Sequence, residues 1–67
     1  MHTDEKLVMM ANQIATFFAA QGEERAVPAI ADHIRKFWDP EMRRKFLKIA
    51  PDAKLHPFVR SALPLVH

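Results

Sequence analysis

The side chains that could support chemistry are few and lie far apart in the sequence. The four histidines are His2, His33, His56 and His67, so no two have the i, i+4 spacing of a helical zinc site. There is no cysteine, which excludes disulfides, thiolate zinc sites and thiolate ligation of an iron–sulfur cluster. We therefore predict no metal site on this chain.

Motifs for nucleophilic catalysis or phosphate binding are also missing. Ser61 is the only serine and has no nucleophile-elbow motif around it. The single glycine, Gly22, cannot form a glycine-rich phosphate loop. Asp32 and His33 are adjacent, so on a helix they point to different faces. We predict that the chain has no catalytic residue, binds no cofactor and is not an enzyme.

The most informative segment spans residues 33–44 and combines the only tryptophan with the densest basic cluster. Tryptophan and arginine supply much of the binding energy at protein interfaces. We predict a partner interface anchored by Phe37 and Trp38, with Asp39 and Pro40 as a rigid structural corner between two helices. Charge-assisted contacts to partner carboxylates are assigned to Arg35, Arg43 and Arg44.

Length and charge limit the class of protein further. The chain has 67 residues, enough for a single helical domain over 1–67 that buries only about 60% of its unfolded surface. The net charge is −3 over residues 1–34 and +5 over residues 35–67, so the two halves can attract each other or different partners. No secretory signal or membrane-length apolar run is visible, and we expect a cytoplasmic protein.

Capping residues and apolar spacing predict an all-α fold without strands, a small bundle of three helices and a short fourth C-terminal helix. Thr3 can cap the first helix. Pro28 suits the first turn of the second helix, and Asp39-Pro40 marks the start of the third. We expect an irregular tail over 65–67. The predicted helices span about residues 4–21, 27–38, 40–50 and 57–63.

Large apolar residues occur in adjacent pairs, which on a helix point in directions about 100° apart. A small bundle has only one interior, so we expect one member of each pair to remain partly exposed and to form an apolar patch for a protein partner. The pairs are Met9-Met10, Phe17-Phe18 and Phe37-Trp38.

Two alternative partners remain open at this point. The basic residues over 35–48, with a helix on each side of a turn, could form a helix-turn-helix-like nucleic-acid module. The third helix has few of the Asn, Gln, Ser and Thr side chains that contact bases, so this alternative is the less favoured one. A homo-oligomer of the isolated chain is the other alternative, because the broad apolar arc of the first helix would also serve a self-contact.

Two segments resemble the delta subunit of NAD-dependent, molybdenum-containing formate dehydrogenase. They are KLVMMANQI, which begins at Lys6, and ADHIRKFWDP, which begins at Ala31. Phe17-Phe18 and Gln21-Gly22 lie between them and share the likeness, which covers about residues 4–44.

The resemblance implies a small accessory subunit of a cytoplasmic complex. In that family the large subunit holds the molybdenum cofactor and iron–sulfur clusters, and other subunits carry FMN and the NAD site. The delta chain is expected to help assembly or hold the quaternary structure, with the large subunit as its partner and no cofactor of its own. A transient assembly chaperone that acts during cofactor insertion is the alternative.

Overall fold

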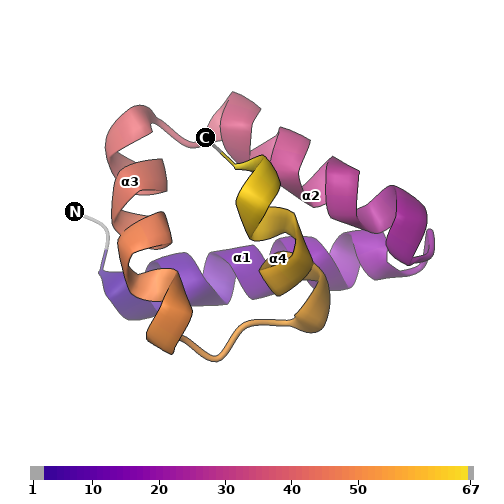
Figure 1. Cartoon of the computed structure of the whole chain (residues 1–67), viewed down its shortest axis with the longest axis horizontal. Coiled ribbons are helices and arrows are strands. Elements are labelled where there is room, and N and C mark those ends of the chain that lie inside the picture. Colours follow the sequence, from indigo (N-terminus) through magenta and orange to yellow (C-terminus); the bar gives the residue numbers. More distant parts are fainter. Residues whose placement is uncertain (1–2, 67) are drawn as a thin grey trace.

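The computed structural model describes residues 3–66, which form four α-helices and two short 3-10 helices and contain no strand (Figure 1). The predicted all-α class, with a short fourth helix, is confirmed. In Figure 1, α1 and α2 run alongside each other, α3 stands across one end of α1, and α4 packs on both α1 and α2. The helices are α1 (Asp4–Ala19), α2 (Glu23–Phe37), α3 (Pro40–Ile49) and α4 (Pro57–Ala62), with 3-10 helices at Ala50–Asp52 and Leu63–Leu65.

Helix α1 begins where local capping chemistry predicts. The Lys6 backbone N–H donates to Oγ1 of Thr3 at 3.2 Å, and Asp4 and Glu5 occupy the first turn, near the positive end of the helix dipole. The helix ends at Ala19 rather than at residue 21. Gly22 then adopts φ 88°, a conformation that favours glycine, and reverses the chain toward α2.

The predicted start of the second helix is wrong, because α2 begins at Glu23 rather than at residue 27. The Ala26 backbone N–H donates to the Gly22 carbonyl at 2.8 Å, so the first helical turn closes directly after the glycine. Pro28 therefore lies inside the helix instead of in its first turn. It removes one helical N–H donor close to the N-terminal end, where a short interruption of the hydrogen-bond ladder is tolerated best.

The corner between α2 and α3 has the predicted construction. Oδ1 of Asp39 accepts a hydrogen bond from the Met42 backbone N–H at 2.8 Å, and Pro40 occupies the first position of α3. Helix α4 repeats the arrangement with a histidine, since Nδ1 of His56 accepts from the Phe58 backbone N–H at 3.0 Å. Both short helices thus start at a side-chain cap followed by proline.

The end of the described chain is more ordered than the predicted irregular tail. After α4 the chain forms the 3-10 helix, and Val66 is only 2% exposed within the core. Nη1 of Arg35 donates to the Leu65 carbonyl at 3.1 Å, which ties this segment to α2. Burial of Val66 and this long-range hydrogen bond are the physical reasons for the correction. His67 lies outside the described residues.

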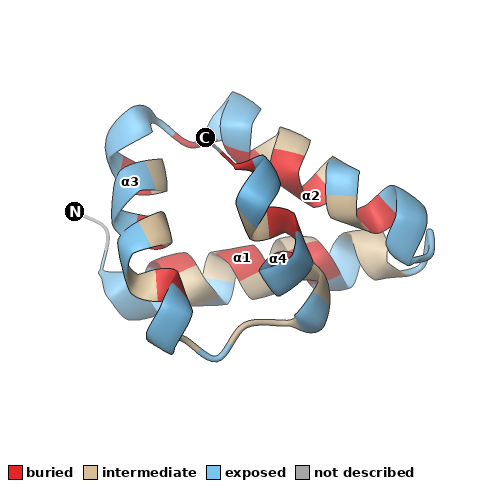
Figure 2. Cartoon of the chain, in the orientation of Figure 1, coloured by how far each residue is buried: buried red, intermediate tan, exposed pale blue. Residues whose placement is uncertain are grey.

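The core is apolar and lies between the four helices, where Figure 2 shows the buried positions facing inward. No polar or charged side chain of residues 3–66 is buried. The Trp38 ring, 4% exposed, meets the fully buried Phe46 ring edge-on at a centroid distance of 5.3 Å. The largest fully buried side chains are Phe46, Leu7, Ile30, Ile34 and Val59.

Asn12 joins the middle of α1 to the segment before α4. Its Nδ2 donates to the Lys54 carbonyl at 3.0 Å, and its Oδ1 accepts from the His56 backbone N–H at 2.9 Å. We expect Asn12→Ala to lower the free energy of unfolding by about 1–3 kcal/mol, because both backbone groups lose their partner. Urea denaturation followed by circular dichroism measures this, with the exposed neighbour Gln13→Ala as a control that stays within about 0.5 kcal/mol. Equal effects of the two variants would contradict the assignment.

Candidate protein-interaction surface

Four rings form a continuous series across the surface of α1 and α2, which we call the aromatic row: Phe17, Phe18, His33 and Phe37. Phe17 and Phe18 meet edge-on at 5.2 Å, and Phe18 lies 6.2 Å from His33. The imidazole of His33 lies 4.7 Å from the Phe37 ring. At the two ends of the row, Phe17 is 76% exposed and Phe37 is 72% exposed. Large exposed aromatic surface of this kind is typical of a protein contact.

The predicted division of the adjacent apolar pairs is confirmed. In each pair one member packs on or in the core and the other is exposed, because neighbouring helical positions point about 100° apart. The exposed members are Met9, Phe17 and Phe37, and their packed neighbours are Met10, Phe18 and Trp38.

A hollow of about 360 Å³ lies beside the aromatic row, between α1 and α2. Its apolar lining comes from Met10 and Ile14 together with the rings of Phe17, Phe18 and Trp38. Gln13 and His33 supply its polar groups, and no Asp, Glu, Lys or Arg contributes. The surface around the aromatic row is therefore apolar and has no formal charge at its centre.

Trp38, predicted as an anchor together with Phe37, lies in the core of the described chain. Its ring packs on Phe46, so its contact with a partner is limited to the small exposed part that lines the hollow. Phe37 is the residue of this pair that faces outward. The indole instead fixes the end of α2 and so positions the Phe37 ring.

The three arginines of the predicted interface have different surroundings. Nη1 of Arg43 donates to the carbonyls of Arg35 and Trp38, at 3.0 and 2.6 Å, near the C-terminal end of α2. Arg35 donates to the tail at Leu65. Arg44 is exposed and makes no hydrogen bond or ion pair with other residues of the described range 3–66. Arg43 and Arg35 thus hold the corner together, and Arg44 remains available to a partner.

Arg43 and Arg44 provide a matched pair of substitutions. We expect Arg43→Ala to lower the free energy of unfolding by about 1–3 kcal/mol, since hydrogen bonds from a charged donor to two carbonyls are lost. Arg44→Ala should change it by less than about 0.5 kcal/mol. Thermal unfolding of the two variants makes the comparison, and an Arg44 effect as large as that of Arg43 would rule out this division of roles.

Asp32 lies one position from the aromatic row and pairs with two cations. Lys36 Nζ lies 3.0 Å from Oδ2 of Asp32, and Arg35 Nη2 lies 3.4 Å from Oδ1. The hydrogen bond from Lys36, helped by Arg35, lowers the pKa of the Asp32 carboxyl. These exposed ion pairs stabilise the folded chain slightly. Their contribution is fully present above the ordinary pKa of an Asp carboxyl and is lost as the pH falls through the lowered pKa of Asp32. At neutral pH the single Asp32 carboxylate is shared between two cations, of which Lys36 lies beside the row and Arg35 also bonds to Leu65.

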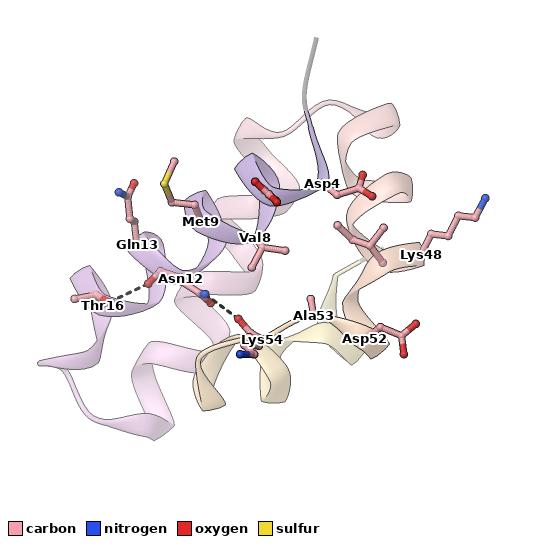
Figure 3. Close-up of a pocket in the computed structure, with 12 residues that line it drawn as sticks. Asp4, Val8, Met9, Asn12, Gln13, Thr16, Lys48, Asp52, Ala53 and Lys54 are labelled. Carbon is pink, nitrogen blue, oxygen red and sulfur yellow. Dashed lines mark hydrogen bonds between the residues drawn. The ribbon is translucent and has the colours of Figure 1, made fainter.

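A second, wider groove of about 990 Å³ runs between α1 and residues 48–54 (Figure 3). Val8, Met9 and Ile49 give it an apolar strip, and charged side chains of both signs border it. Figure 3 shows Asn12 reaching across to the Lys54 backbone. Because its border carries mixed charge and its lining includes no aromatic ring, this groove is a weaker candidate than the aromatic row.

The comparison with protein families identifies the chain. A family model described as the NADH-dependent formate dehydrogenase delta subunit, FdsD, matches residues 6–63. The chain belongs to this family. The match confirms the resemblance seen in the sequence and extends it over α3 and α4. No match was found among curated proteins or among solved structures.

The sequence has no cysteine for an iron–sulfur cluster and a single glycine, and no three His, Asp or Glu side chains within residues 3–66 converge on a common point. His33 belongs to the aromatic row and His56 caps α4, while His2 and His67 lie outside the described residues. None of the described helices is both long enough and apolar enough to cross a membrane.

Proposed function

We propose that this chain is a non-catalytic accessory subunit that assembles with the NADH-dependent formate dehydrogenase complex, or stabilises it, through protein–protein contacts in the cytoplasm. The observation that carries the proposal is the exposure of two large rings, Phe17 at 76% and Phe37 at 72%, in a chain that belongs to the delta-subunit family. Its partner is the large subunit that bears the molybdenum cofactor.

Burial of the exposed rings supplies the driving force. Full burial of one phenylalanine side chain contributes about 1.5–3 kcal/mol. A chain of 67 residues has a small core, so association with a larger protein also adds to its own stability. Covering the aromatic row therefore favours both binding and folding of the delta chain.

The predicted interface residues have two kinds of role in this proposal. Phe37 and Arg44, both exposed, contact the partner directly. The others position them, since Trp38 anchors the end of α2 and Arg43 bonds to its carbonyls. Arg35, Asp39 and Pro40 likewise hold the corner.

The molybdenum cofactor, iron–sulfur clusters, FMN and NAD are held by other subunits in this proposal. The delta chain acts on the amount of assembled enzyme and leaves the chemical step to those subunits. Its own residues lack the thiolates and the phosphate-binding loop that such groups need.

Stoichiometry tests the proposal. A tagged copy of this chain is expected to co-purify with active formate dehydrogenase at a constant ratio to the large subunit. Deletion of the chain should lower the yield of assembled complex while leaving kcat per assembled enzyme unchanged. Its absence from the mature, active enzyme would favour the transient chaperone instead, and its absence from every assembly stage would contradict both roles.

A further inference from the structure

We propose that the aromatic row and its hollow receive an uncharged apolar segment of another formate dehydrogenase subunit, bordered by Asp or Glu. This inference rests on the proposed function and names the chemistry of the partner. The size of the hollow, the absence of charged side chains from its lining and the charge at the edge of the aromatic row each support a part of this inference.

The hollow is suited to protruding side chains. Its volume of about 360 Å³ lies at the lower end of the roughly 300–1,000 Å³ found in ligand pockets. The rings of Phe17 and Trp38 and the aliphatic Ile14 line it, so a branched aliphatic or aromatic side chain would gain contact on several sides. Its polar groups, on Gln13 and His33, can hydrogen-bond to backbone beside the inserted side chain.

The absence of charge at the centre selects an uncharged occupant. Charged residues make up 27% of the chain, yet none lines the hollow. A Lys, Arg, Asp or Glu inserted there would lose its hydration without gaining an opposite charge. The central part of the partner segment is therefore apolar.

At the edge of the aromatic row, unlike at its centre, a charged residue of the occupant is favoured. Asp32 and Lys36 form a pair of helical neighbours that runs parallel to His33 and Phe37, one position away on α2. Lys36 shares the Asp32 carboxylate with Arg35, which also bonds to Leu65, so the Lys36 ammonium at this edge is only partly neutralised. An acidic residue at the border of the occupant complements that charge and fixes its orientation.

A pair of charge insertions on α1 tests the inference. The remaining formate dehydrogenase subunits, produced without this chain, are titrated onto immobilised wild type, Phe17→Glu and Met9→Glu. Both positions are exposed, so both variants should keep the helical circular dichroism of the wild type, but only Phe17 lines the hollow. Phe17→Glu is expected to weaken binding by at least about 30-fold, and Met9→Glu by less than about threefold.

The salt dependence of binding and a crosslink then distinguish the contribution of the charged edge from that of the uncharged centre. Lys36→Glu should weaken binding by about threefold to tenfold at about 0.05 M salt. Wild-type affinity should fall by no more than about the same factor between about 0.05 and about 0.5 M salt, because salt screens only this exposed contact. A photo-crosslinking residue at Phe37 should label an apolar segment of another subunit with Asp or Glu beside it.

The outcomes are distinguishable. Failure of the wild type to bind the other subunits would overturn the proposed function. Normal binding by Phe17→Glu, steep loss of affinity with salt, or a crosslink to a second copy of this chain would overturn the inference and leave the proposed function standing.

Discussion

Trp38→Ala is expected to lower the free energy of unfolding by about 3–5 kcal/mol. The indole is 4% exposed and packs edge-on against Phe46, so its removal leaves a cavity in the centre of the small core. A loss of this size is a large share of the total stability of a chain of 67 residues. Urea denaturation, followed by circular dichroism, measures it.

The adjacent residue gives the control. Phe37 is 72% exposed, so Phe37→Ala should change the free energy of unfolding by less than about 0.5 kcal/mol. The two variants thus distinguish a residue that stabilises the fold, Trp38, from an adjacent residue that is available for binding, Phe37. A stable Trp38→Ala protein, or a Phe37→Ala protein that unfolds as easily as Trp38→Ala, would contradict this division of roles between the two rings.

The double variant Phe17→Ala/Phe37→Ala is expected to lose about 10²–10⁴-fold in affinity for the other formate dehydrogenase subunits. Each ring is an exposed aromatic anchor, and truncation of such a residue at the centre of an interface costs about 2 kcal/mol or more. The folded chain should be unaffected, because neither ring belongs to the core. Isothermal titration of the variant against those subunits gives the affinity.

Met9→Ala/Leu65→Ala is the matched control for this loss. It also removes two exposed apolar side chains, 51% and 41% exposed, but neither lines the hollow or belongs to the aromatic row. Its affinity should stay within about threefold of the wild type. Equal losses in both double variants would mean that exposed apolar area in general, rather than the aromatic row, drives binding.

Features that depend on a few neighbouring residues could be predicted from the sequence. The Thr3 cap and the Asp39-Pro40 corner both follow from side chains that bond to backbone three residues later. Exposure of one side chain in each adjacent apolar pair also followed, because neighbouring helical positions point about 100° apart. The start of α2 does not follow from Pro28, because Gly22 with its positive φ sets the boundary and the helix begins directly after it.

Features that depend on tertiary packing could not be predicted in the same way. Which ring of the Phe37-Trp38 pair turns inward depends on Phe46, which packs from α3. The hydrogen bonds of Arg35 and Arg43 join elements that only the folded chain brings together. Asn12 had a detectable signal, a polar residue that shares a face of α1 with Val8 and Ala15, but its partners lie more than 40 residues away.

Side-chain footprinting of Phe17 and Phe37 in the free chain and in the assembled complex tests the central claim most directly. Hydroxyl radicals oxidise exposed side chains, and Met9, on the same helix as Phe17 but outside the hollow, serves as the internal reference. Covering of the aromatic row by another subunit predicts that oxidation of both phenylalanines falls several-fold relative to Met9 on assembly. Equal oxidation of Phe17 and Phe37 in the free and assembled states would contradict it.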